Sequence, residues 1–327
     1  MNINYKLKII LLKLSLLFFS SLIFLISFEL TIRVFYPYFS NYNMEMWRYS
    51  KELKRTTNNK KLPFVHLPNQ ISTLYGVTIE TDSNGFRING IKRDFEDKIL
   101  FLGDSFTLGW GVADDSTFTN LVQEISLVKG NKIETINAGC GNYNTVMEVE
   151  LLKRKLSLVN PKIIVFNYYI NDIEPTPKSI SKIKYYFMTN FYIYGYIFNK
   201  YAMLKSKFDY KFKNNYYKTL YDNYYQANFL AFQELVEICH KNDIKLLVTN
   251  IPDLRKLKEY PYNFATNHIK KIAEDLNVEF LDFYPIIENK PPELLWVSNE
   301  DPHANAMANN AFAKAIYNRL SEKNWVK

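Results

Sequence analysis

The stretch Lys98-Ile-Leu-Phe-Leu-Gly-Asp-Ser105 decides the fold class of this 327-residue chain. Four consecutive apolar residues follow Lys98 and a glycine ends the run, which is typical of a strand buried on both faces of a parallel sheet. A serine just beyond such a strand lies at the sheet edge where parallel α/β proteins bind their ligands. The stretch therefore predicts a parallel α/β fold and a candidate nucleophile, Ser105.

The same pattern recurs along the chain and indicates how large the sheet is. Strands alternate with helices of 10 to 17 residues, which predicts a parallel sheet with helices on both faces. The predicted strands are 98–103, 132–137, 162–168, 244–250 and 278–283, and the predicted helices are 118–127, 146–158, 228–242, 262–277 and 304–320.

The N-terminus decides the compartment. Residues 9–28 read IILLKLSLLFFSSLIFLISF, an apolar stretch of about 20 residues, which is enough to span a bilayer as a helix. Lys6 and Lys8 precede it, and positive charge on a short flank favours keeping that end in the cytoplasm. A cleaved signal peptide is the alternative, but no small-x-small site follows the run. We expect a single-pass membrane protein whose remainder is periplasmic or otherwise extracytoplasmic.

The composition outlines three parts of the chain. We predict an N-terminal membrane anchor at 1–35, an irregular lead-in segment at 36–97 and a catalytic domain at 98–327. The catalytic domain includes an insertion at 176–226 with nine Lys, two Asp and 12 of the 25 Tyr, in a chain of net charge +8. This insertion is interpreted as a cap that stacks on sugars, as a contact with anionic lipid headgroups, or as an ordinary helical insertion with a solvated basic face.

Two further loops should emerge at the same sheet edge as Ser105. The second strand ends in Asn137-Ala-Gly-Cys-Gly141-Asn142-Tyr-Asn144, and the third ends in Tyr168-Tyr-Ile-Asn171-Asp172. Gly and Asn tolerate the left-handed backbone that directs successive N–H groups into one cavity, and an Asn side chain adds a donor. The backbone amides of Ser105, Gly141 and Asn142 and the side chain of Asn171 are therefore candidates for an oxyanion hole.

The block Glu300-Asp301-Pro302-His303 comes directly before the last helix. A serine hydroxyl needs a base within hydrogen-bond reach, and His303 can serve while Asp301 holds its other ring nitrogen. The other histidines have no such neighbours, and we expect His240 and His268 on solvated helix faces. No spacing of ligand residues suggests a metal site.

Taken together, the four blocks resemble the SGNH hydrolase superfamily, also called GDSL esterases. Its motif residues are a serine in Gly-Asp-Ser, a glycine, an asparagine and a C-terminal Asp/His pair. Ser105, Asn171, Asp301 and His303 match them, and the resemblance spans roughly residues 98–320. It implies a flavodoxin-like three-layer α/β/α sandwich with a parallel sheet, preceded here by one transmembrane helix.

The sequence departs from the family pattern in two places. The last block is Asp-x-His rather than Asp-x-x-His, which is similar to a membrane-associated branch acting on polysaccharides that includes alginate O-acetyltransferase-like proteins. Glu300 stands at the longer spacing and is the reserve candidate for the acid. Asn142 stands where the donor glycine usually lies, so Gly141 and Asn142 both stay candidates. Arg87, in a turn that resembles this branch, and Asp104 are candidates for supporting roles.

The function expected from this resemblance is acyl transfer through Ser105. The chain would be an acyl-ester hydrolase or an O-acetyltransferase acting on cell-envelope or exported glycan, with no cofactor and no metal. Its expected partners are this substrate, the membrane and other envelope polysaccharide-modifying proteins, but no nucleic acid. The alternative is a catalytically inactive, membrane-anchored carbohydrate-binding or assembly subunit. We expect Cys140 and Cys239 to stay unpaired, because Cys140 lies in the second loop.

Overall fold

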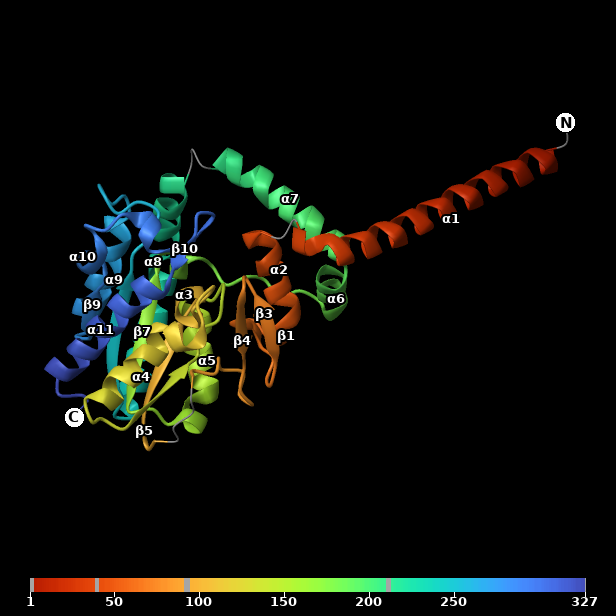
Figure 1. The fold of residues 1–327 in the computed structure, drawn as a ribbon. Coiled ribbons are helices and arrows are strands. Elements are labelled where there is room, and N and C mark those ends of the chain that lie inside the picture. Colours follow the sequence, from red (N-terminus) through yellow and green to blue (C-terminus); the bar gives the residue numbers. More distant parts are fainter. Residues whose placement is uncertain (1–2, 39–40, 91–94, 210–212, 327) are drawn as a thin grey trace. The chain divides into compact units, whose positions relative to one another are not determined.

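The computed structural model describes residues 3–38, 41–90, 95–209 and 213–326 (Figure 1). Contacts divide the chain into two compact units. One, here called the helical unit, comprises 1–51 and 181–208, and the other, called the sheet unit, comprises 52–180 and 209–327. The predicted boundaries after residues 35 and 97 follow composition, whereas these units follow contacts between elements.

The sheet unit is built on five parallel strands in the order β6-β5-β7-β8-β9. This is the flavodoxin-like order, so the predicted fold class is confirmed. All five predicted strands are present with ends shifted by at most a few residues. Their bounds are β5 Asp97–Gly103, β6 Ile133–Asn137, β7 Ile163–Tyr169, β8 Lys245–Ile251 and β9 Glu279–Asp282.

Helices cover the sheet and form one continuous core with it. Helix α4 packs against α11, and α5 packs against α8. On the α4 side the rings of Phe118 and Phe312 lie 6.5 Å apart, and on the α8 side those of Phe166 and Phe232 lie 4.9 Å apart. The helices of this unit are α3 Ser105–Leu108, α4 Phe118–Val128, α5 Thr145–Val159, α8 Lys213–Lys241, α9 Asn263–Asp275, α10 Tyr284–Ile287 and α11 Ala306–Glu322.

The lead-in segment 36–97 is more ordered than its sequence pattern indicates. It contains helix α2 (Tyr42–Glu52) and two antiparallel hairpins, β1–β2 (Lys54–Asn59, Leu62–His66) and β3–β4 (Ile71–Leu74, Val77–Glu80). Strands of four to six residues with mixed polarity give too few alternations to be recognised in a sequence. The backbone N–H of Arg87 then donates to the carbonyl of Asn137 (3.1 Å), so this segment reaches the sheet at β6.

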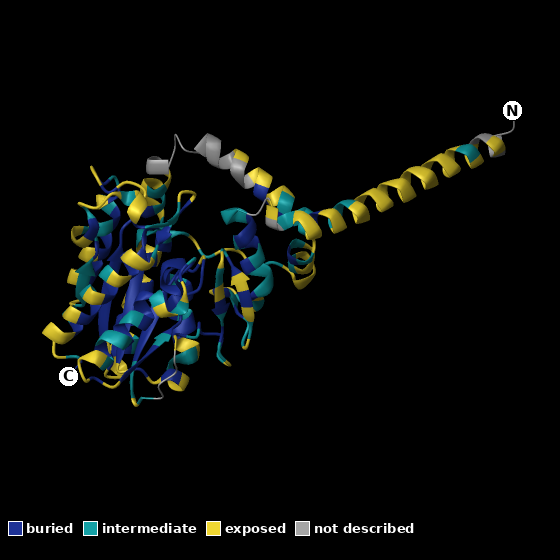
Figure 2. Ribbon diagram, viewed as in Figure 1, coloured by how far each residue is buried: buried dark blue, intermediate teal, exposed yellow. Residues whose placement is uncertain are grey.

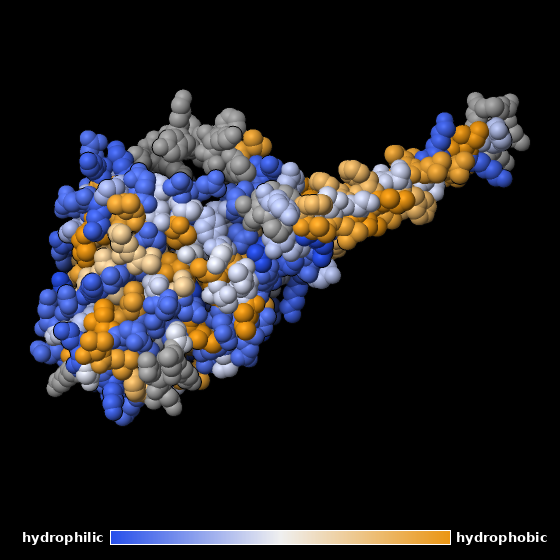
Figure 3. Space-filling model, viewed as in Figure 1, coloured by the Kyte–Doolittle hydropathy of each residue, from blue (hydrophilic) through white to orange (hydrophobic). Residues whose placement is uncertain are grey.

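The helical unit combines the N-terminal helix with part of the predicted insertion. It contains α1 (Ile3–Phe35), a short turn (Tyr36–Tyr38), most of α2, α6 (Lys182–Asn190) and α7 (Tyr192–Asp209). The rest of the insertion from Lys213 onward begins helix α8 of the sheet unit. In α1, Leu7–Phe35 is long and apolar enough to cross a membrane, by length and composition. Most of its side chains are exposed and apolar, whereas Phe28 and Glu29 are half-buried and Ile32 is buried near its C-terminal end (Figures 2 and 3).

Candidate active site

The candidate nucleophile stands at the first residue of helix α3. Strand β5 ends at Gly103, and the Asp104 carboxylate accepts a hydrogen bond from the backbone N–H of Phe106 (2.9 Å), which caps the helix. Ser105 is 7% exposed. Its own N–H belongs to the first turn, whose N–H groups have no partner within the helix. Ser105 therefore offers a hydroxyl and an unused helix N-terminal amide at the same point.

The candidate base and the candidate acid come from one short strand. The hairpin of β10 (Trp296–Ser298) and β11 (Asp301–Ala304) carries both residues. Side chains two residues apart in a strand lie on the same face, which explains why Asp-x-His suffices here. The Asp301 carboxylate accepts hydrogen bonds from the ring Nδ1–H (2.5 Å) and the backbone N–H (3.1 Å) of His303. This fixes the ring tautomer, and the unprotonated Nε2 accepts a hydrogen bond from the Ser105 hydroxyl at 2.9 Å.

Trp110 completes the surroundings of the acid. Its indole N–H donates to the second oxygen of Asp301 at 2.8 Å. Burial alone raises the pKa of Asp301, but the hydrogen bonds from His303 and Trp110 outweigh it, and the net pKa is lowered. Asp301 thus stays a carboxylate that can stabilise an imidazolium. Glu300, the reserve candidate, is exposed, and it is Asp301 that contacts His303.

Asn171 reaches the nucleophile through Asp104. It lies in a single helical turn directly after β7, and its side-chain amide donates to Asp104 at 3.2 Å. The same Asp104 oxygen lies 3.4 Å from the Ser105 hydroxyl. Asp104 thereby orients the side-chain amide of Asn171. This amide has a second N–H, which can donate to a substrate oxygen.

A buried lysine holds the second loop, and no pattern in the sequence indicates it. Lys54, in β1, donates to the Gly141 carbonyl (2.5 Å) and to the Asn142 side chain (3.3 Å). Burial lowers the pKa of Lys54 to about 8. Because the C=O and the following N–H of a trans peptide point in opposite directions, the Asn142 N–H points away from Lys54. It donates to no residue in the described part of the chain, and Asn142 has a left-handed φ of 67°.

Arg87 braces the loop that follows α3. Its guanidinium is buried and donates to three carbonyls, those of Leu108, Gly109 and Val112, each at 2.7 Å, and it pairs with Asp114 at 2.5 Å. Trp110 lies in the middle of this loop. Arg87 therefore fixes the loop from which Trp110 reaches Asp301. None of these hydrogen bonds joins Arg87 to Ser105 or His303.

The rim of the site is aromatic and carries one partly exposed cation. The ring of Phe106 lies 4.9 Å from that of His303 and 4.5 Å from that of Tyr169. The Tyr169 hydroxyl donates to Asp253 (3.1 Å), which also pairs with Arg255 at 2.5 Å. Asp253 is buried, whereas the Arg255 side chain is 46% exposed. The aromatic rings of Phe106 and Tyr169 and the guanidinium of Arg255 thus follow one another outward from His303.

Two carboxyl groups are buried behind the site. Burial and the nearby Asp104 raise the pKa of Glu148, and burial, Glu148 and Asp104 raise that of Asp172. Among the described residues, both carboxyl oxygens of Glu148 lack a hydrogen-bond partner, and so does one carboxyl oxygen of Asp172. Burial and the neighbouring carboxyl groups therefore favour the neutral form of both side chains.

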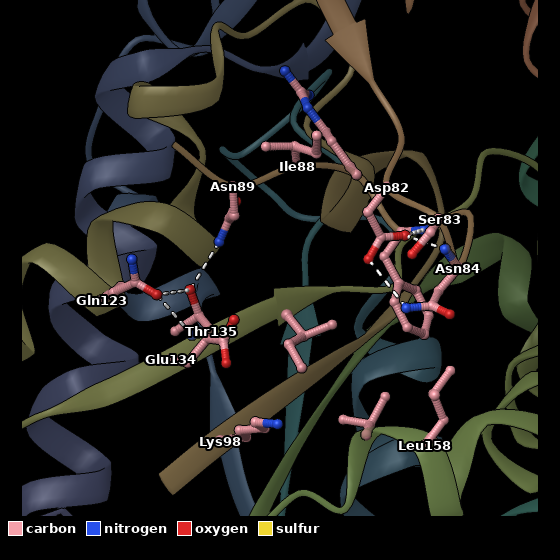
Figure 4. Close-up of a pocket in the computed structure, with 14 residues that line it drawn as sticks. Asp82, Ser83, Asn84, Ile88, Asn89, Lys98, Gln123, Glu134, Thr135 and Leu158 are labelled. Atoms are coloured by element: carbon pink, nitrogen blue, oxygen red, sulfur yellow. Dashed lines mark hydrogen bonds between the residues drawn. The ribbon is translucent and has the colours of Figure 1, made fainter. Parts of the chain in front are cut away.

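A separate pocket of about 280 Å³ lies where the segment Asp82–Asn89 meets β6 and the end of α5 (Figure 4). Its wall is fixed by Asn89, which donates to Thr135 at 2.8 Å, and by Gln123, which accepts from the Thr135 N–H at 2.9 Å. Ser105, Asp301 and His303 do not line it. We therefore assign it no part in the candidate chemistry.

Two further expectations concern residues away from the triad. His268 was expected on a solvated helix face, but this expectation is wrong, because its ring is buried and bonded to Asn228 at 3.0 Å. Burial lowers the pKa of His268 to about 4. His240 is exposed, and Cys140 and Cys239 are buried thiols that form no disulfide. Across residues 3–38, 41–90, 95–209 and 213–326 no cluster of three metal-ligating side chains occurs.

The structure thus brings Ser105, His303, Asp301, Asn171 and Asp104 into one hydrogen-bonded chain. The sequence interpretation missed Trp110 and Lys54. An indole between two glycines carries no motif, and a lysine in a short hairpin is normally solvated. Together the residues can activate a hydroxyl and stabilise an oxyanion, which is the chemistry of ester cleavage.

The fold and this arrangement together are those of the SGNH hydrolases, a class of esterases. The chain belongs to the GDSL-like lipase/acylhydrolase family, whose family model matches residues 101–310. No curated protein matches the sequence.

Solved structures similar to this chain come from several bacteria. The esterase EstA from Pseudoalteromonas sp. is 15% identical, with a TM-score of 0.44 over 69% of this chain and 100% of that one. A lipase/acylhydrolase from Enterococcus faecalis is 14% identical, with a TM-score of 0.45 over 71% and 97%. A family two carbohydrate esterase from Clostridium thermocellum is 12% identical, with a TM-score of 0.44 over 72% and 67%. At these TM-scores the similarities do not bear on substrate.

Proposed function

We propose that this protein is a membrane-anchored serine esterase or O-acetyltransferase that acts on acyl groups of cell-envelope or exported glycan. The observation that carries the proposal is the hydrogen-bond chain from Ser105 through His303 to Asp301. A non-catalytic binding subunit would have no need of a buried carboxylate that fixes the tautomer of a histidine beside a serine.

In the proposed reaction, His303 Nε2 takes the Ser105 proton while Oγ forms a bond to the ester carbonyl carbon. The carbonyl oxygen becomes an oxyanion, which the Ser105 and Asn142 amides and the Asn171 side chain stabilise. His303 then gives its proton to the leaving alcohol oxygen as the C–O bond breaks. The oxygen of water or of a sugar hydroxyl next loses its proton to His303 and forms a bond to the acyl carbon, and His303 returns this proton to Ser105 Oγ as the bond from Oγ to the acyl carbon breaks. The first acceptor makes the protein an esterase, and the second makes it an acetyltransferase.

Two features support a glycan as the substrate or acceptor. Buried aromatic rings, those of Phe106 and Tyr169, line the reacting group, and the partly exposed guanidinium of Arg255 beyond them can donate hydrogen bonds to the oxygens of a glycan. The apolar helix α1 would tether the site near the envelope and place it, with the N-terminus cytoplasmic, on the outer side. Other envelope polysaccharide-modifying proteins are the partners we propose there.

The decisive experiment is detection of an acyl-enzyme by intact mass. We expect an activated acetyl ester to add one acetyl group to the wild-type protein and none to Ser105→Ala. Ser157→Ala, which alters an exposed serine on α5, is the matched control and should acetylate normally. Release of the acetyl group to water or to oligosaccharides then separates esterase from transferase. Equal turnover by wild type and Ser105→Ala would contradict the assignment of Ser105 as the nucleophile, whereas no turnover by either protein would contradict the proposal and favour the binding subunit.

A further inference from the structure

The α6–α7 segment (residues 182–209) is attached to the apolar N-terminal helix by charge-assisted hydrogen bonds. The Glu29 carboxylate accepts from the backbone N–H groups of Tyr192 (3.0 Å) and Ile193 (2.9 Å), the first two residues of α7. Arg33 pairs with Glu29 at 2.7 Å and donates to the Asn190 carbonyl at 2.9 Å. A carboxylate at a helix N-terminus accepts hydrogen bonds from backbone N–H groups that have no partner within the helix, and its negative charge interacts favourably with the positive end of the helix dipole. The N-terminus of α7 is therefore attached to α1 by these hydrogen bonds.

Helix α2 holds the α6–α7 segment from a second direction. The Trp47 indole N–H donates to the Met188 carbonyl (2.7 Å), and the Tyr185 hydroxyl donates to the Ser50 carbonyl (2.6 Å). Gly195 allows the close approach, because a Cβ there would lie 2.5 Å from the Trp47 ring. The segment thus has a fixed orientation within the helical unit.

The side of the segment that these contacts leave open is strongly apolar. Eight large apolar side chains are between 39% and 74% exposed, a set far denser than the isolated apolar residues normal on a soluble surface. They are Ile183, Tyr186, Phe187, Phe191, Ile197, Phe198, Tyr201 and Leu204. Such a surface needs a cover of low polarity.

The position of the α6–α7 segment at the end of α1 and its excess of lysine both favour lipid as the cover of this apolar surface. At 1.5 Å per residue, residues 9–28 of α1 fill a hydrocarbon core of about 30 Å. Glu29 then lies at its boundary and brings the start of α7 there. Residues 182–209 contain five Lys, one acidic residue (Asp209) and ten aromatic residues. Lysine attracts anionic headgroups, and aromatic rings are enriched at the membrane interface. A second copy of the segment would bring like charges together, which disfavours self-association.

We propose that the α6–α7 segment lies in the headgroup layer of the membrane that α1 crosses, with its apolar side against acyl chains and its lysines at anionic phospholipid. The proposal rests on the membrane placement of α1 within the proposed function. It adds a second membrane contact, made by an internal part of the chain and independent of catalysis.

The test places an environment-sensitive fluorophore at single introduced cysteines in the full-length protein, reconstituted in nanodiscs of 70% phosphatidylcholine and 30% phosphatidylglycerol. The native cysteines are buried, so labelling of the unsubstituted protein gives the background. We expect Phe198→Cys to show blue-shifted emission and strong quenching by lipids with a spin label high on the acyl chain. Val128→Cys, an exposed apolar position in the sheet unit, should show neither effect. Replacing phosphatidylglycerol by phosphatidylcholine should weaken the quenching at 198.

Leu17→Cys, in the middle of α1, distinguishes the two possible failures. Quenching at 17 without quenching at 198 overturns this proposal and leaves the anchor intact. No quenching at either position overturns the anchor as well. Blue-shifted emission at 198 without lipid quenching means that protein covers the surface, which also overturns the proposal.

Discussion

Asp301 and His303 lie on the same face of β11, and one carboxylate oxygen of Asp301 accepts both the ring N–H and the backbone N–H of His303. The acid and the base are therefore one rigid element rather than two loops brought together. The two-residue spacing is sufficient because an extended strand turns every second side chain to the same side.

Asp301→Asn should lower kcat for an activated acetyl ester by about 10⁴-fold, because the amide can hold the wrong imidazole tautomer. The binding of substrate should change little. Steady-state kinetics measure this, with Glu300→Gln as the matched control. A large loss in Glu300→Gln and a small one in Asp301→Asn would instead assign the acid to Glu300.

Asn171→Ala should lower kcat by about 10²- to 10³-fold, the usual effect of removing one oxyanion donor. The acyl-enzyme should still form, only more slowly, because Ser105 and His303 are untouched. Single-turnover kinetics give the acylation rate. Asn318→Ala, at an exposed position within α11, is the control for an asparagine remote from the site, and an equal loss there would refute the assignment.

Lys54→Met should reduce kcat by up to about 10²-fold while leaving KM near the wild-type value. The reason is that the Gly141–Asn142 peptide loses the donor that orients it, and small displacements of catalytic groups are costly. Lys61→Met, at the exposed turn of the same hairpin, should be neutral. Thermal melts of both variants distinguish a misplaced loop from an unfolded protein, and unchanged kcat in a folded Lys54→Met would exclude this role.

Glu148→Gln should change how stability depends on pH. The pKa of Glu148 is raised in the folded protein by burial and by Asp104, so between its unfolded value of about 4.3 and the raised value the folded state binds more protons. The free energy of unfolding must then fall as pH rises through this window. Denaturant titrations at several pH values should show a smaller fall in Glu148→Gln. Parallel curves for the two proteins would mean that Glu148 is ionised in the fold.

Arg255→Gln should lower kcat/KM by about tenfold for acetyl esters that carry a carboxylate next to the ester, and hardly at all for neutral ones. The partly exposed guanidinium can donate a charge-assisted hydrogen bond to such a group. Added salt should shrink the difference. Lys256→Gln removes a neighbouring exposed charge and serves as the control. Equal losses on charged and neutral esters would contradict a recognition role for Arg255.

The sequence was sufficient to predict the strands of the sheet and the proximity of the four motif residues. The reason is that both depend on short, local sequence patterns. Buried parallel strands are continuous apolar runs, and their carboxyl ends share one edge, so Ser105, Asn171 and the second loop had to meet. The register confirms this, since Gly103 pairs with Asn167 and Phe101 pairs with Asn137.

What the sequence did not reveal depends on contacts between distant segments. Trp110 acquires its role only because Arg87 fixes its loop, and Lys54 is buried only because β1 packs beside residues 141–142. His268 was misplaced because the long helix α8 covers the face of α9 that carries it, with the Tyr221 ring 4.9 Å from its own. The insertion was treated as one segment, although α6 and α7 contact α1 while α8 packs against α5.

The helical unit is made from two separate pieces of chain, 1–51 and 181–208, and this bears on how a soluble form of the enzyme should be engineered. Deleting the first 35 residues alone removes Glu29 and Arg33 and strips α7 of its N-terminal cap, while its apolar side remains. A truncated protein of that kind is expected to aggregate. A well-behaved version needs both pieces removed, with a short flexible link from residue 180 to residue 209.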